Sequence, residues 1–87
     1  MSEKTDSMPD IDFNTFIMSL NASALYNLGM IPDPGTGQKN KNISLAKQTI
    51  DIIAMLKEKT KGNLNEEEIK LIENILHDLR LMYVKES

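Results

Sequence analysis

FNTFIMSLNASALYNLGMIP, residues 13–32, contains no charged side chain, although 26% of the chain is charged. At helical spacing its apolar residues form one stripe with additional apolar surface on both flanks. The stripe is Phe13, Phe16, Ile17, Leu20, Ala24 and Leu28, and the flanks are Met18, Ala22 and Leu25. A helix that is apolar over most of its circumference is unsuited to the surface, so we expect the rest of the chain to cover it.

A membrane span is the alternative, because a bilayer core requires ~20 apolar residues. Asn14, Asn21 and Asn27 argue against it, since a side-chain amide without a partner is costly in hydrocarbon. No Lys or Arg closely flanks either end of the stretch as an interfacial anchor. We therefore predict no membrane span and a central helix in a soluble assembly.

Length and composition restrict the possible classes of protein. Eighty-seven residues suffice for one domain, and a domain of this size buries only ~60 to 65% of its unfolded surface. The absence of cysteine leaves no disulfide framework and no thiolate ligand, which agrees with the reducing cytoplasm as the expected location. Thirteen acidic against ten basic residues give a formal net charge of −3, which repels nucleic-acid phosphates. We predict no nucleic-acid partner.

Residues 1–10 are polar and mixed in charge, and they are predicted to form a disordered tail before a single helical domain at 11–87. The first helix is expected at about 12–29, with Asp12 as its N-cap and Ile11 packing on Phe16 as a hydrophobic staple. Gly29 would end the helix in a left-handed conformation, and Met30 would fold back toward the preceding turn in a Schellman motif.

Residues 31–42 contain two prolines and two glycines, which predicts a loop with a turn at Asp33-Pro34-Gly35. The GTGQK run inside it lacks the spacing and the flanking strand of a phosphate-binding loop. A second helix is expected at about 43–61, capped by Asn42 or Ser44, which the sequence does not distinguish. Its main apolar face is Ala46, Thr49, Ile50, Ile53 and Leu56, widened by Leu45, Ile52 and Met55.

A third helix is expected at about 65–84, and the short link before it predicts an antiparallel hairpin with the second helix. Asn65 and Glu68 have the spacing of a capping box, and Leu64 and Ile69 that of a staple. Its predicted buried face is Ile69, Ile72, Leu76, Leu79 and Tyr83, with Leu71, Ile75, Leu81 and Met82 left over. The predicted fold is thus an all-α, three-helix domain.

The surplus apolar surface predicts a homo-oligomer, most simply a twofold dimer in which the first helix packs against its mate. Burying a Leu or Ile side chain contributes ~1.5 to 3 kcal/mol, so several exposed ones favour association. The small residues of the first helix would let two backbones approach, and a buried Asn21 would fix the register, although a solvated Asn21 is equally compatible with the pattern. The candidate interface is Met18, Ser19, Asn21, Ala22, Ser23, Leu25, Ile52 and Met55.

Three segments resemble a bacterial family of unknown function, DUF1844. They are FNTFIMSLNASAL with LGMIPDPGTG, LAKQTIDIIAMLKEKTKGNLNEEE, and LHDLRLMYV, and together they span nearly all of the chain after residue 12. The resemblance implies a small helical protein and supplies no activity, ligand or catalytic residue. Asn65 stands where the family more often has Thr, and His77 where it more often has an aromatic residue, which argues against a catalytic role for His77.

Few side chains suggest chemistry. His77 is the only histidine, and Glu73 one turn earlier is placed to bond its ring, but a zinc centre needs at least three convergent ligands. We expect no cofactor and no metal. A candidate surface for another protein combines the loop with two charged positions of the third helix. These residues are Pro32, Asp33, Pro34, Thr36, Gly37, Asp78 and Arg80.

Three functional hypotheses follow. The preferred one is a non-catalytic helical module that associates with itself and with another protein. The second is a module that binds a small apolar or lipid-like ligand between its helices. The third, for which the sequence offers least support, is an enzyme that uses His77 or carboxylates.

Overall fold

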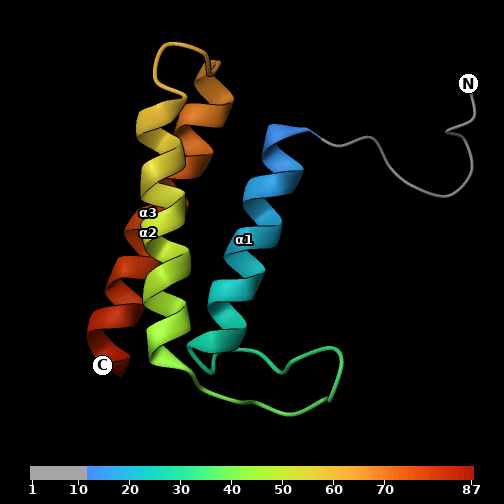
Figure 1. Ribbon diagram of the computed structural model, residues 1–87. Helices are drawn as coiled ribbons and strands as arrows, with labels where there is room; N and C mark the ends of the chain where they lie inside the picture. Colours follow the sequence, from blue (N-terminus) through green and yellow to red (C-terminus); the bar gives the residue numbers. More distant parts are fainter. Residues whose placement is uncertain (1–11) are drawn as a thin grey trace, which may run out of the picture.

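The computed structural model describes residues 12–87 and contains three helices (Figure 1). They are α1 (Phe13–Asn27), α2 (Ile43–Lys59) and α3 (Glu66–Glu86). The predicted tail at 1–10 and the contribution of Ile11 to a staple lie outside the described residues. Within the described part all regular secondary structure is helical, which confirms the predicted all-α, three-helix fold.

The three helices pack against one another around one core. Figure 1 shows α2 and α3 as an antiparallel hairpin, with α1 alongside and its N-terminal end pointing toward the end of the bundle that holds the hairpin turn. The connection from α1 to α2 lies at the opposite end of the molecule, near the C-terminus. The fully buried large side chains are Ile17, Leu28, Ile53, Ile72 and Leu79, so every helix or its cap contributes to the core.

The ends of α1 follow the predicted capping chemistry. The Asp12 carboxylate accepts a hydrogen bond from the Thr15 amide at 2.8 Å. At the other end Gly29 has φ +78°, its amide donates to the Tyr26 carbonyl, and the Met30 amide donates to the Leu25 carbonyl at 2.9 Å. This pair of bonds is a Schellman motif, which satisfies carbonyls that the helix itself leaves free.

The hairpin between α2 and α3 is fixed by local hydrogen bonds. The Asn65 side chain accepts from the Glu68 amide at 2.8 Å, and the Glu68 side chain accepts from the Asn65 amide at 2.9 Å. The predicted capping box is therefore confirmed. Gly62 has φ +88°, a conformation that costs glycine little, and it turns the chain after α2. Asn42 rather than Ser44 caps α2, through the Leu45 amide.

Each of the three helices ends two residues away from its predicted end, and α1 stops at Asn27 where Gly29 was expected. Helix α2 ends at Lys59 and is capped by Thr60, whereas its end was expected at Lys61. The hydroxyl of Thr60 donates to the Leu56 carbonyl at 2.6 Å and occupies one of the last carbonyls of the helix. Helix α3 continues to Glu86, two residues beyond Val84. All three differences concern terminal turns, where helix boundaries are least sharply defined.

The predicted buried faces of α1 and α3 are partly wrong. Phe16 is 44% exposed, because the stripe defined by Ile17, Ala24 and Leu28 lies about 100° around the helix from it. On α3, Ile75 is buried and Ile69 is exposed. The buried stripe of α3 is rotated toward Ile75, and Ile69 lies at the hairpin end, where it faces a cleft. Leu71, Met82 and Tyr83 are partly buried against the core.

Two leucines on α3 give a matched test of this core. Leu79 is fully buried and Leu81, two residues later, is 54% exposed. We expect Leu79→Ala to lower the free energy of unfolding by about 2 to 5 kcal/mol, because it removes apolar contacts and leaves a cavity. Leu81→Ala should change it by less than about 0.5 kcal/mol. Urea unfolding monitored by circular dichroism measures both, and equal losses would contradict the assigned core.

The N-cap of α1 predicts a dependence on pH. The hydrogen bond from the Thr15 amide lowers the pKa of the exposed Asp12 carboxylate. A lowered pKa means stabilisation that is complete above the pKa of unfolded aspartate and lost as the pH falls through the folded pKa. In thermal unfolding, the wild type should therefore have a higher melting temperature than Asp12→Asn at neutral pH. The difference should disappear in acid, because asparagine caps the helix without ionising. A difference in melting temperature that does not change with pH would exclude this role of the Asp12 carboxylate.

Candidate functional site

The outer side of α1 is an uncharged surface. Thr15 and Ser19 are exposed there, one turn apart, and the Ser19 hydroxyl donates to the Phe16 carbonyl at 2.8 Å. Phe16 and Met18 are both exposed, on opposite flanks of the helix, since two residues correspond to about 200° of rotation. No residue of α1 carries a charge. The exposed side of α1 therefore consists of small hydroxyl-bearing side chains flanked by two large apolar ones.

A second exposed apolar surface, here called the α2 strip, consists of Leu45, Ile52 and Met55. Their side chains are 45%, 38% and 50% exposed, respectively. Steps of seven and three residues place them along one side of the helix. The strip is bordered by Lys47 and Asp51, whose side chains form an ion pair at 2.9 Å. That hydrogen bond raises the pKa of Lys47 and so favours the charged form of its ammonium group.

The predicted interface residues divide into two groups in the single chain. Met18, Ser19, Ile52 and Met55 are exposed, whereas Asn21, Ala22, Ser23 and Leu25 are partly buried. Asn21 lies four residues after Ile17 and three before Ala24, on the inward half of α1, which is a poor position for pairing across an outer surface. The structure describes one copy, so the interface itself stays a prediction.

Phe16 was predicted to lie in the core and Leu45 to widen the apolar face of α2, whereas both side chains lie at the surface. The periodicity of α2 contained the relevant signal for Leu45. Its main apolar face already included Ala46, Thr49 and Ile53, which are buried, so a residue on the margin of that face remains exposed. For Phe16 the sequence offered no such signal, because nearly every position of α1 is apolar or small.

The loop of the predicted partner surface is a closed turn organised by Asp33. Its carboxylate accepts from the Gly35 amide at 2.8 Å, and its carbonyl accepts from the amides of Thr36 and Gly37. The Asp33 amide donates to the Gln38 carbonyl at 2.9 Å and closes the loop. The loop's polar groups are thus largely used internally. Pro32, Pro34, Thr36 and Gly37 are exposed, and Asp33 is partly buried.

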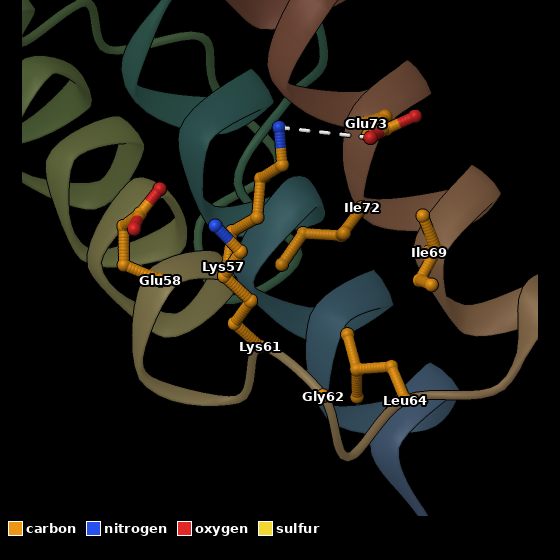
Figure 2. A pocket seen from close by; sticks show the side chains of 8 residues that line it. All are labelled: Lys57, Glu58, Lys61, Gly62, Leu64, Ile69, Ile72 and Glu73. Carbon is orange, nitrogen blue, oxygen red and sulfur yellow. Dashed lines mark ion pairs between the residues drawn. The ribbon is translucent and has the colours of Figure 1, made fainter.

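A cleft of about 350 Å³ lies at the hairpin end of α2 and α3 (Figure 2). Leu64, Ile69 and Ile72 provide its apolar side, and no residue of α1 lines it. Charged side chains surround this apolar part. They are Lys57, Glu58, Lys61 and Glu73. The Lys57 ammonium and the Glu73 carboxylate are 3.7 Å apart across the helices, as the dashed line in Figure 2 marks.

The third helix does not assemble a site around its histidine. His77 is exposed, and the carboxylate of Glu73 contacts Lys57 on α2. Asp78 and Arg80 are exposed but about 200° apart around α3, so they do not belong to one surface. Over residues 12–87, no three His, Cys, Asp or Glu side chains are grouped as a metal ion would require.

Comparisons with known proteins identify a family for the chain and add no chemistry. In the described part of the chain, none of the helices has the length and apolar character needed to cross a membrane, as predicted. No curated protein and no solved structure matches the chain. A family model with the description Domain of unknown function (DUF1844) matches residues 10–85. Since the match covers most of its length, the chain belongs to the DUF1844 family, as the sequence segments suggested.

Proposed function

We propose that this protein is a non-catalytic helical module that acts through protein–protein contacts and first of all associates with itself. The observation that carries the proposal is the uncharged, exposed outer side of α1 around Ser19. A helix that faced only water would be expected to carry charged side chains on that side. A twofold dimer would remove this surface from water by pairing it with its own copy.

The number of exposed apolar side chains supports the same proposal. Nine large hydrophobic residues of the described chain are exposed, distributed over all three helices and the loop. Isolated ones are ordinary on soluble proteins, but grouped ones mark contact surfaces. Leu45, Ile52 and Met55 form such a group on α2, and Phe16 and Met18 flank the uncharged outer side of α1. A cytoplasmic location is part of the proposal, and the absence of cysteine supports it.

A charge placed on the outer side of α1 tests the proposal. Ser19→Arg should weaken self-association about tenfold or more, because two guanidinium groups would meet near the twofold axis and lose water. Asn74→Arg adds the same charge to an exposed position of α3 and should leave association unchanged. Sedimentation equilibrium over a wide range of concentration measures the dissociation constants. A wild-type chain that stays a single copy throughout would refute the proposed function.

The hairpin cleft supports a second candidate function, the binding of a small amphiphilic molecule. Its volume of about 350 Å³ lies at the lower end of the range for ligand pockets, and four charged side chains surround its apolar part. These features leave room for a short acyl chain and not for a membrane lipid. We therefore rank ligand binding below self-association.

A titration with octanoate, followed by amide NMR signals, distinguishes the two functions. Self-association alone predicts no saturable shift at Leu64 or Ile69. Saturable shifts at both residues, abolished by Ile69→Lys and retained in Leu81→Lys, would establish the second function. The two variants place the same charge on α3, inside the cleft at Ile69 and outside it at Leu81.

A further inference from the structure

We propose that the α2 strip is the second half of the dimer interface and that α1 of the second copy covers it. This inference rests on the proposed self-association and specifies its geometry. Each copy would contribute its α1–α2 pair, and the two pairs would pack as a four-helix arrangement related by a twofold axis. Helix α3 would remain on the outside of the dimer.

The spacing of the strip indicates a helix as its occupant. Leu45 and Ile52 are seven residues apart and Met55 follows three residues later, which is the spacing of the apolar seam between two packed helices. Gln48 and Lys59 occupy the remaining positions of the same seam. A seam of this kind is elongated along the helix axis, so a second helix lying nearly parallel to it buries all three apolar side chains.

Charge decides which helix of the second copy fits. The strip is bordered by Lys47, Asp51 and Glu58, and Lys59 lies at its end. Pairing α2 with its own copy about an axis near Ile52 would bring the two Lys47–Asp51 ion pairs toward the contact and remove water from them, which opposes association. Helix α3 begins with three consecutive glutamates and carries charges along its length. Helix α1 carries none, so it meets the strip without like-charge repulsion.

Interface size leads to the same conclusion. Helix α1 has 15 residues and is therefore only ~22 Å long. A contact between two such helices through Thr15, Ser19 and Ala22 involves small side chains, whereas stable interfaces bury roughly 1,200 to 2,000 Å² in total. Including the strip adds three half-exposed large side chains from each copy. Both surfaces together come closer to the area that a stable dimer needs.

The absence of cysteine makes the arrangement directly testable by crosslinking. One copy would carry Ser19→Cys on α1 and a differently tagged copy Gln48→Cys on the strip, and the mixture would be treated with a short bifunctional thiol reagent. We expect crosslinked dimers that contain both tags. Replacing Gln48→Cys by Asn74→Cys, an exposed position on α3, should reduce the mixed product at least tenfold.

The outcomes separate this inference from the proposed function. Mixed crosslinks that form with Gln48→Cys and fail with Asn74→Cys support the four-helix arrangement. Crosslinks only between two Ser19→Cys copies, or equal yields with both partners, overturn it while sedimentation still reports a dimer. Sedimentation of the wild-type chain as a single copy overturns the inference and the proposed function together.

Discussion

The structure depends on one constraint, which is that α1 has no charged residue and contributes large apolar side chains on more than one side. Two helices can cover only the inward part of such a helix. Ile17 and Ala24 are fully buried between α2 and α3, together with Leu28 at the cap, while Phe16 and Met18 on the two flanks stay exposed. The small size of the domain adds to this constraint, because a chain of this length has little additional surface with which to cover a helix.

The connections of the fold hold α1 in place with short-range hydrogen bonds. The Schellman motif after Asn27 ends the helix, and the Asn42 amide then donates to the Asn27 carbonyl at 2.7 Å, which brings the start of α2 back beside the end of α1. The ion pair between Lys41 and Glu86, at 2.6 Å, joins the same region to the end of α3. Both residues are partly exposed, so this ion pair orients the chain more than it stabilises it.

Element type and the capping residues followed from the sequence because they depend on local chemistry. Asp12, Gly29, Gly62 and the Asn65–Glu68 pair act within a few residues of themselves, and the structure places each as predicted. Burial is different, because it depends on where the other helices lie. Phe16 and Ile69 fit an apolar stripe on their own helices, but the neighbouring helices cover them only in part. The sequence pattern limits the direction of a buried face only to within about one residue's rotation.

The same distinction between local chemistry and burial explains which residues of the candidate interface could be predicted from the sequence. Small residues and missing charges on α1 are visible in the sequence, so Met18 and Ser19 were predictable candidates and are exposed. Leu45 joins Ile52 and Met55 in one strip only once Ala46, Thr49 and Ile53 are known to face the core. The buried face of α2 thus defines the exposed one, since a helix with more apolar positions than its two neighbours can cover must present the remainder at its surface. Together with the outer side of α1, the α2 strip is an uncharged surface that a single copy leaves uncovered in the described part of the chain.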